Sequence, residues 1–459
     1  MKVFTLALFF LSLILVVVEI SGVDCAWGQG SSFGTEAPDL KGEDWRQLLE
    51  SIPDATEQGS PRLQIANENA YAFRSIIAPE IYPFVKAGKL KMGVVRSLRY
   101  SLDSKEAKSS KDFQYLLNQE LSATEEIELP KIIPFPEVFN AEALSKDPRA
   151  AEKILWNMIF RQSKQLFQKI SLSFRSLTSE NKGREINAEL LRVYPLAIEA
   201  KIKTPQLFRE ILRFKDPPAY HSLAFLTFRF LNREEDLLWV FSPAISKTRQ
   251  LTGTNRGDLL PGFSLGLEDL FGWSGNLRFV EASLTGVRQV LLPFTELDML
   301  KLQKSSFVEN NDICFELGSR EVVPRQDLVE LGLSEDNSDS LPWLPTNSVF
   351  VPRMTWRIEV APKDPYSEAG RQVLYIDKDL LVPAINVVFD RAGKLWRIIL
   401  SGFSQAKNEE KEISFLSFMS AFDVRTNKAT VVNIKGVSYC ENLPPNISLA
   451  DFDPSSLGK

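Results

Sequence analysis

Three kinds of residue in this sequence could carry chemistry: a serine between glycines, a single histidine, and a group of carboxylates near the serine. Gly262-Phe263-Ser264-Leu265-Gly266 has the G-x-S-x-G pattern that, in α/β-hydrolases, places a nucleophilic serine on a strained strand-to-helix turn. Here Pro261 precedes the pattern and no expected strand leads into it. His221 comes before the serine, whereas a hydrolase histidine follows it. We therefore interpret residues 262–266 as a glycine loop and keep an esterase built on Ser264 only as a third hypothesis.

Asp258, Glu268 and Asp269 lie in the same loop and could together bind a cation such as calcium. They lack the one-three-five spacing of a calcium loop, so we interpret them as solvated or capping carboxylates. One histidine cannot build a two-histidine metal site. The sequence thus predicts no catalytic residues, no metal and no cofactor, and we expect a protein that is not an enzyme.

Composition restricts the class of protein further. The chain is 44% hydrophobic and 25% charged, which is ordinary for a globular protein and excludes disorder as its main state. The formal net charge of −5 provides no basic field for a nucleic-acid backbone. We expect no nucleic-acid partner.

The N-terminus has the three parts of a signal peptide. Lys2 supplies a positive charge, residues 3–18 are apolar without a charge, and small residues follow up to residue 28. We assign residues 1–26 to the leader, residues 27–63 to a loosely ordered segment, and residues 64–459 to a single domain. Export to the periplasm is expected. An uncleaved anchor is the alternative, although the apolar run is short for a bilayer core about 30 Å thick, and Cys25 is a poor lipidation site because Asp24 precedes it.

Cys314 and Cys440 remain once the leader has been removed. An even number of cysteines in an oxidising compartment is compatible with one disulfide. Two buried free thiols are the alternative, since spacing in the sequence cannot place the two residues within bonding distance.

The first half of the chain has helical periodicity. Asp147-Pro148 is a helix start signal, and an apolar stripe follows at helical spacing from Ile154 to Ile170. Thr204-Pro205 predicts a second, short helix that carries Leu207, Ile211 and Leu212, and residues 113–121 are expected to be partly helical. Residues 167–215 as a whole look more helical and less alternating than a strand-rich fold would suggest, so the sequence does not define a strand register there.

From residue 222 the periodicity is that of strands. Residues 223–231 and 237–245 predict a β-hairpin around a polar turn, the glycine-rich stretch 252–276 predicts a loop, and residues 277–292 predict a strand. Six further strands separated by tight turns are expected at residues 349–360, 372–376, 384–389, 395–400, 413–424 and 428–434. Because no crossover helix separates these six, they predict an antiparallel meander.

Four groups of segments, taken in order along the chain, form a recognisable set. The first is IPFP at 133–136 with ILWN at 154–157 and Arg161, and the second is DPP at 216–218. The third is LWVFSPA at 238–244 with Arg249, LPG at 260–262 and LEDLFGWSG at 267–275, and the fourth is WRIE at 356–359, VLYID at 373–377 and FDRAGKLW at 389–396. Together these segments resemble the domain-of-unknown-function 1329 family, which comprises envelope proteins of Gram-negative bacteria related to LolA-like lipoprotein carriers.

The resemblance implies an α+β fold that is mostly antiparallel: a LolA/LolB-like curved sheet, or incomplete barrel, with helices packed on its concave face. It supplies no catalytic residues. We expect Trp239, Phe241, Trp356 and Tyr375 to line a cavity for a hydrophobic ligand, although such aromatics also simply fill cores.

The leading functional hypothesis is a periplasmic, non-enzymatic carrier or chaperone for a lipid or for lipoprotein acyl chains. The alternative is a protein-interaction subunit of an envelope transport or efflux assembly without a lipid ligand. Family members are often associated with inner-membrane transporters of the resistance-nodulation-division type, so such a transporter is an expected partner in both cases.

Overall fold

One antiparallel sheet organises most of the chain, and each of its strands pairs with the next in an antiparallel ladder. From one edge to the other its strands are β8 (Lys247–Leu251), β7 (Leu237–Ser242), β6 (Ala224–Phe230), β5 (Gln206–Asp216), β4 (Glu185–Val193), β3 (Phe167–Leu177), β18 (Lys428–Cys440), β17 (Glu412–Asp423), β16 (Leu395–Lys407), β15 (Pro383–Asp390), β14 (Ala369–Asp377), β13 (Ser348–Pro362) and β9 (Val280–Thr295).

The structure is a computed structural model. It describes residues 44–54, 62–96, 98, 136–162, 166–180, 183–195, 206–230, 235–295, 300–301, 303–304, 314–317, 343–345, 348–407 and 412–458. The expected leader, most of the segment 27–63 and the expected helix at 113–121 lie outside these residues. The described residues belong to one compact unit, Gly42–Lys459. None of the described helices is long and apolar enough to cross a membrane.

Short strands and helices surround the sheet. The short strands are β1 (Leu63–Ile65), β2 (Met92–Val94), β10 (Leu300–Lys301), β11 (Gln303–Lys304) and β12 (Cys314–Leu317). The α-helices are α1 (Asp44–Glu50), α2 (Tyr82–Lys86), α5 (Ala141–Ser145) and α6 (Ala150–Gln162). The 3-10 helices are η1 (Ala70–Phe73), η3 (Pro136–Phe139), η4 (Gly253–Gly257), η5 (Leu267–Asp269), η6 (Leu277–Phe279), η8 (Leu449–Phe452) and η9 (Pro454–Ser456).

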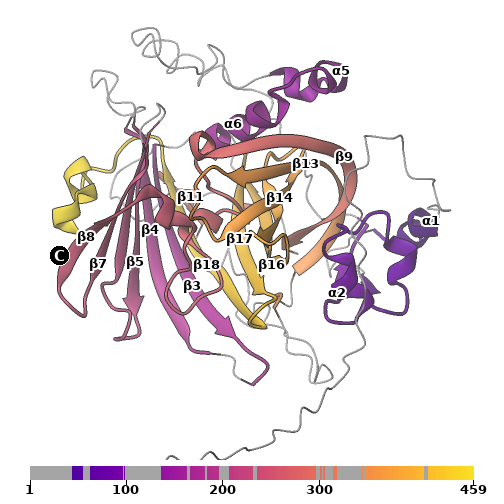
Figure 1. Cartoon of the computed structure of the whole chain (residues 1–459), viewed down its shortest axis with the longest axis horizontal. Helices are drawn as coiled ribbons and strands as arrows, with labels where there is room; N and C mark the ends of the chain where they lie inside the picture. The colour runs from indigo at the N-terminus through magenta and orange to yellow at the C-terminus, as the bar shows by residue number, and fades with distance from the viewer. Residues whose placement is uncertain are drawn as a thin grey trace, which may run out of the picture. The chain divides into compact units, whose positions relative to one another are not determined.

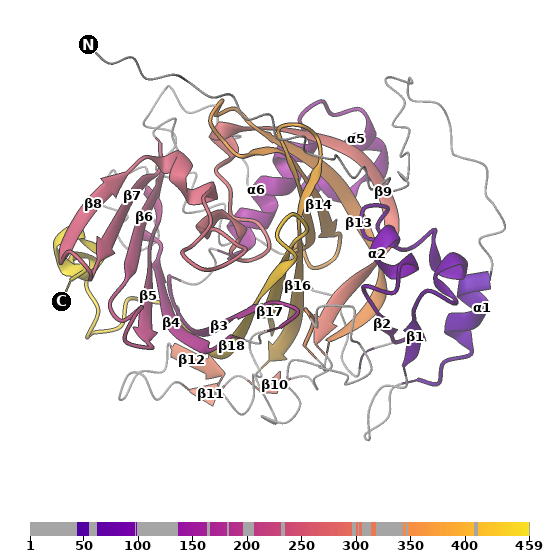
Figure 2. The ribbon, with the colours of Figure 1, turned by 60° about the horizontal axis from the view of Figure 1, so that its bottom comes forward.

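The sheet is strongly curved and does not close (Figure 1; Figure 2). Its first edge, β8, is exposed and pairs only with β7 in the described part of the chain. Its last strand, β9, pairs with β13 and reaches β16 at a single position, Phe294 opposite Phe403. The expected α+β, mostly antiparallel, incomplete barrel is confirmed.

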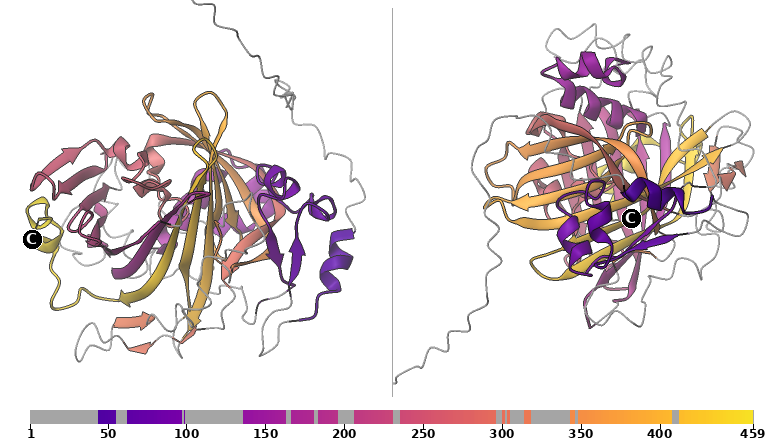
Figure 3. Two further views of the ribbon diagram at one scale, coloured as in Figure 1. Left: turned by 90° about the horizontal axis from the view of Figure 1, so that it is seen from below. Right: turned by 90° about the vertical axis from the view of Figure 1, so that its right-hand side faces the viewer.

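The two faces of the sheet have different coverings. Ile154 and Leu155 of α6 share a buried cluster with Trp356 and Leu374 on the concave face. Glu80, which precedes α2, instead accepts a hydrogen bond from Tyr375 on the convex face. Helices α1 and α2 lie outside the curve of the sheet (Figure 1; Figure 3). The concave face is therefore covered by only some of the helices, among them α6.

The expected helices between residues 167 and 215 are wrong. β3, β4 and β5 occupy this region, and the apolar stripe that begins at Ile154 ends with α6 at Gln162, before β3 starts at Phe167. In β5, Leu212 faces the concave side and Ile211 the convex side, and both are buried. Strands that are covered on both faces lose the alternation of polar and apolar residues, so three apolar positions matched a helical period by coincidence.

The expected hairpin, loop and C-terminal meander are confirmed. β6 and β7 form the hairpin, with Phe225 opposite Val240, and β13 to β18 follow one another as antiparallel neighbours. The carboxylate of Asp390 accepts hydrogen bonds from the backbone of Ala392 and Lys394, which closes the tight turn between β15 and β16.

Candidate functional site

The most distinctive feature of the concave face is the connection between the two edges of the sheet. Residues 252–279, which we call the strap, leave β8 at one edge and enter β9 at the other. Figure 2 shows this connection crossing inside the curve of the sheet. Hydrogen bonds fix it to the strands beneath: Ser264 N donates to Thr430 Oγ1 at 2.8 Å and Asn386 Nδ2 donates to the carbonyl of Gly272 at 3.2 Å. The strap therefore covers the surface that an open barrel would offer to a ligand.

One part of the strap is apolar and packs on aromatic rings of the sheet. The ring of Phe263 lies parallel to that of Phe214 with centroids 6.0 Å apart, and its centroid is 5.1 Å from that of Phe174. Tyr220 adds a further ring at 5.9 Å. The strap also buries four leucines against this side of the sheet, namely Leu260, Leu265, Leu267 and Leu270. The covered surface is thus strongly apolar.

The G-x-S-x-G residues belong to this covering. Ser264 is buried, at 4% exposure, and the structure uses its backbone N–H to hold the strap. The Nδ1 atom of His221 lies 2.6 Å from the carbonyl oxygen of Lys215. No hydrogen bond joins Ser264 to His221 in the described structure. The geometry is that of a packed loop, as expected.

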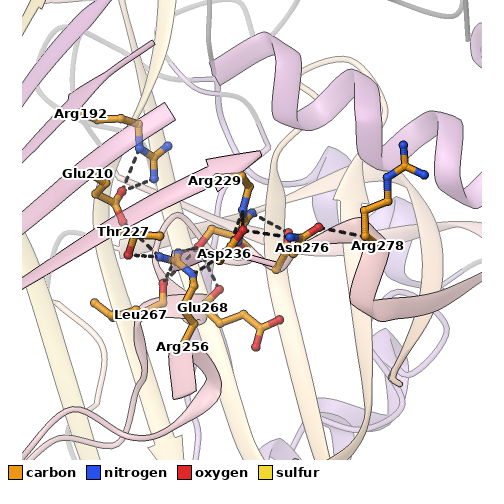
Figure 4. A network of polar contacts seen from close by, with 12 residues as sticks. Arg192, Glu210, Thr227, Arg229, Asp236, Arg256, Leu267, Glu268, Asn276 and Arg278 are labelled. Atoms are coloured by element: carbon orange, nitrogen blue, oxygen red, sulfur yellow. Dashed lines mark hydrogen bonds and ion pairs between the residues drawn. The ribbon is translucent and has the colours of Figure 1, made fainter. Parts of the chain in front are cut away.

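The other part of the strap is polar and meets a row of charges on β4, β5 and β6 (Figure 4). Arg192 Nε donates to Glu210 at 2.8 Å, and Arg256 of the strap donates to Thr227 Oγ1 at 2.6 Å. Arg229 binds Asp236 through Nε and Nη2, with a shortest distance of 2.6 Å. These charges are buried, so each must be compensated by an opposite charge or by hydrogen bonds.

Arg229 also holds the strap directly. Its Nη1 donates to the carbonyls of Ser274 and Gly275, at 2.9 Å each. At the centre of the strap, Arg397 of β16 forms a buried ion pair with Asp269, whose carboxylate also accepts from Gly266 N at 2.7 Å. The polar network therefore sets the position of the strap.

Burial and neighbouring charges shift the pKa values in this network. Burial disfavours the charged form of Arg192, but the nearby Glu210 more than compensates and raises its pKa. Burial lowers the pKa of Arg256, and repulsion from Arg229 adds to this effect. Burial raises the pKa of Glu268, and the neighbouring Asp269 raises it further. Arg256, Arg229 and Arg397 act in the opposite direction on Glu268 but do not outweigh these two effects.

The three strap carboxylates do not form a metal site. Asp269 caps a 3-10 turn and pairs with Arg397, as the capping interpretation predicted, and Asp258 accepts from Asn255 Nδ2 at 2.7 Å. Across the described residues, no group of three His, Cys, Asp or Glu side chains could hold a metal ion.

The four aromatics expected to line a cavity do not come together. Trp239 and Phe241 lie on the convex face, in a cluster with Phe452 and Leu457 of the C-terminal segment. Tyr375 is also on the convex face, with its hydroxyl 2.8 Å from Glu80. Trp356 alone lies on the concave side, fully buried against α6 and 6.1 Å from the ring of Phe139.

Sequence reasoning missed the aromatic side chains of the strands that line the concave face beneath the strap, among them Phe174, Phe214 and Phe225. The face of each strand follows from its register: Phe174 lies opposite Ile186, and Leu212 lies opposite Phe225. A one-residue change of register moves a side chain to the other face. Because both faces of these strands are apolar, the sequence carried no signal that distinguished Trp239 from Leu238.

Cys314 and Cys440 form a disulfide between β12 and β18. Both residues are fully buried, next to Phe167 on the convex side. The bond therefore fastens the short strand β12 to the sheet and does not line the strap-covered surface.

The sequence matches the model of the family described as protein of unknown function (DUF1329) over residues 64–457. The chain belongs to this family. Among curated proteins no sequence matches this DUF1329 protein.

Solved structures resemble this DUF1329 protein at low identity. A domain described as an outer membrane lipoprotein-sorting protein, from Vibrio parahaemolyticus, is 14% identical, covering 68% of this chain and 100% of its own, with a TM-score of 0.45. A DUF1329 family protein from Desulfovibrio piger is 14% identical, covering 66% and 96%, with a TM-score of 0.41. A LolA superfamily protein from Nitrosomonas europaea is 10% identical, covering 64% and 96%, with a TM-score of 0.36.

Proposed function

We propose that this DUF1329 protein is a non-enzymatic periplasmic carrier that binds a hydrophobic ligand, a lipid or the acyl chains of a lipoprotein, on the concave face of its sheet. The observation that carries the proposal is the strap: an apolar surface lined by Phe174, Phe214 and Phe225 is covered by one loop-like connection and not by further strands. The lipoprotein-sorting description of a similar structure points to the same class of ligand.

The ligand would replace the strap. A cavity beside the polar part of the strap measures about 60 Å³, far below the roughly 300 Å³ at which pockets for organic ligands begin. An acyl chain of about 16 carbons gains roughly 12 kcal/mol on burial, at about 0.8 kcal/mol per methylene. Uncovering the seven buried large apolar side chains of the strap costs roughly 10–21 kcal/mol by the same reasoning. Because the two quantities are similar, exchange of strap for ligand is energetically feasible.

Lipid extraction tests this proposal directly. The purified protein would be extracted with organic solvent and the extract examined by mass spectrometry, and the stripped protein would be titrated with a fluorescent fatty acid. We expect a co-purified lipid and saturable binding of the fatty acid. Repeated absence of both would exclude the carrier function.

A strap variant with a matched control locates the binding surface. Phe263→Ala removes the ring that holds the strap to Phe214 and Phe174, so the fatty acid should bind about tenfold more tightly. Phe241→Ala makes the same change on the convex face and should leave the affinity unaltered. Equal effects of the two substitutions would place the ligand elsewhere.

A protein-interaction subunit without a lipid ligand is the second candidate, and the filled interior of the described sheet favours it. In either role the partner that we propose is an inner-membrane transporter of the resistance-nodulation-division type. A pull-down with lipid-stripped protein and a titration with fatty acid distinguish the two candidates. Recovery of such a transporter without binding of the fatty acid would support the second candidate over the first.

A further inference from the structure

The cavity of about 60 Å³ lies where the polar part of the strap meets the start of β9. Its lining includes Asp236, Gly257, Glu268, Asn276 and Phe279. The volume accommodates a few water molecules or a small polar group, because one water needs roughly 10–15 Å³ of such volume. A ligand group that fits here is therefore small.

Most charges around the cavity are already satisfied by one another. Arg229 uses its Nε and both terminal nitrogens on Asp236 and on the carbonyls of Ser274 and Gly275. The Nη1 and Nη2 atoms of Arg256 donate to Thr227, to the carbonyl of Leu267 and to Ser274 Oγ. Asp236 accepts a further bond from Asn276 Nδ2 at 2.9 Å. Neither arginine donates to the carboxylate of Glu268.

Glu268 is the exception, since none of the described residues donates a hydrogen bond to its carboxylate or forms an ion pair with it. Figure 4 shows this side chain directed away from Arg256, with no contact drawn to its oxygens. Two glycines leave room for the Glu268 carboxylate. A Cβ atom on Gly275 would lie only 2.4 Å from Glu268 Oε1, and a Cβ atom on Gly257 would lie 3.1 Å from Oε2. Glu268 is partly exposed; burial and the neighbouring Asp269 raise the pKa of its carboxyl group, whereas the nearby Arg256, Arg229 and Arg397 act to lower it.

The charged residues that line the cavity have a negative net formal charge. Arg229 and Arg256 balance Asp236 and Glu268, and Glu235 and Asp364 then leave the lining with a formal excess of two negative charges. A cation is favoured for this reason. A metal ion is not, because the described carboxylates do not converge in threes.

We propose that the cavity binds a primary ammonium group, whose N–H bonds satisfy the Glu268 carboxylate. A quaternary ammonium group is disfavoured because it has no N–H to donate, and Phe279 is the only aromatic side chain in the lining whereas quaternary groups need an aromatic cage. The amine comes either from a small free molecule or from the headgroup of an aminophospholipid. The lipid source rests on the proposed carrier function, and the free source does not.

Calorimetric titration of the full-length protein tests the site. The probes are ethanolamine and choline, followed by dihexanoyl-phosphatidylethanolamine and dihexanoyl-phosphatidylcholine. We expect ethanolamine to bind and choline to bind at least tenfold more weakly. Tighter binding of the phosphatidylethanolamine than of ethanolamine assigns the amine to a lipid, and binding of ethanolamine alone assigns it to a free molecule.

Glu268→Gln keeps the shape of the side chain and removes its charge, so it should weaken ethanolamine binding at least tenfold. Glu142→Gln, on exposed α5, makes the same change away from the site and should have no effect. Ethanolamine affinity should also rise with pH as Glu268 ionises, and this dependence should vanish in Glu268→Gln.

Gly257→Ala is a second variant in case Glu268→Gln fails to fold, and its methyl group should narrow the cavity and weaken binding. The site is excluded if ethanolamine does not bind, if choline binds equally well, or if the folded variants bind ethanolamine like the unaltered protein. Because ethanolamine has no acyl chain, this result is independent of the lipid extraction that tests the carrier function.

Discussion

At the residue scale, buried arginines decide where the strap lies. Arg192 and Glu210 are each 2% exposed, and Arg229 and Asp236 are nearly as buried. Such pairs contribute little net stability compared with apolar residues, but a charge left without its partner is strongly destabilising. These pairs instead fix the position of the strap. Arg229 donates hydrogen bonds to two strap carbonyls, which an apolar side chain could not do.

Substitution of one partner of such a pair should therefore lower the free energy of unfolding more than replacement of both partners by apolar residues. Glu210→Gln leaves Arg192 buried without a counter-charge, and we expect a loss of about 3–5 kcal/mol in the free energy of unfolding. The double variant Arg192→Met with Glu210→Leu should recover most of this loss. Urea denaturation of the single and double variants measures both values, and equal stabilities of the two would contradict the assignment.

The pH dependence of stability should identify Glu268. Its pKa is raised above the ordinary value of 4.5 in the folded protein. Between pH 4.5 and the folded pKa, the folded state therefore holds a proton that the unfolded state has released. The stability that protonation contributes is fully present below about pH 4.5 and is lost as the pH rises through the folded pKa. Glu268→Gln should thus melt at a higher temperature than the unaltered protein at pH 7 and at the same temperature near pH 4.

At the scale of elements, the C-terminal segment and the disulfide close the convex face. Arg209 and Arg213 of β5 donate to the carbonyls of Leu449 and Ser456, and Phe452 and Leu457 are fully buried beside Trp239 and Phe241. The aromatic residues of the hairpin therefore contribute to stability on this side of the sheet.

The disulfide should be an important contribution to that stability. It closes a loop with a sequence separation of 126, for which the chain-entropy relation gives about 5 kcal/mol as an upper value. Replacement of Cys314 and Cys440 together by alanine should lower the midpoint of urea unfolding accordingly. Reduction of the unaltered protein should reproduce the shift, and an unchanged midpoint would show that β12 is held by its other contacts.

At the scale of the whole molecule, the strap joins the two edges of the sheet and covers the surface between them. If a fatty acid replaces the strap, backbone amides in residues 252–279 should exchange hydrogen with solvent faster when the ligand is bound. The amide of Ser264, bonded to Thr430, is the most informative. Amides of β15 and β16, in the middle of the sheet, should be unaffected. Slower exchange in the strap upon binding would contradict displacement.

The sequence alone determined the class of fold, the hairpin of β6 and β7 and the C-terminal meander. The turn residues Asp390 to Gly393 and the polar residues 232–236 between two apolar runs are local signals, readable over a few residues. It also led to the correct family, because segments such as LEDLFGWSG occur in order along the chain.

Only the tertiary structure decided which face each aromatic occupies, that residues 167–215 are strands, and that a glycine-rich loop covers the concave face. The physical reason is the same in each case. Strands buried on both sides show apolar residues on both faces, so periodicity cannot assign a face or separate strand from helix. Glu268 was recognised in the sequence as one carboxylate among three. Only the folded structure shows that Arg229, Arg256 and Arg397 direct their hydrogen bonds to other groups, so that the Glu268 carboxylate has no hydrogen bond or ion pair among the described residues.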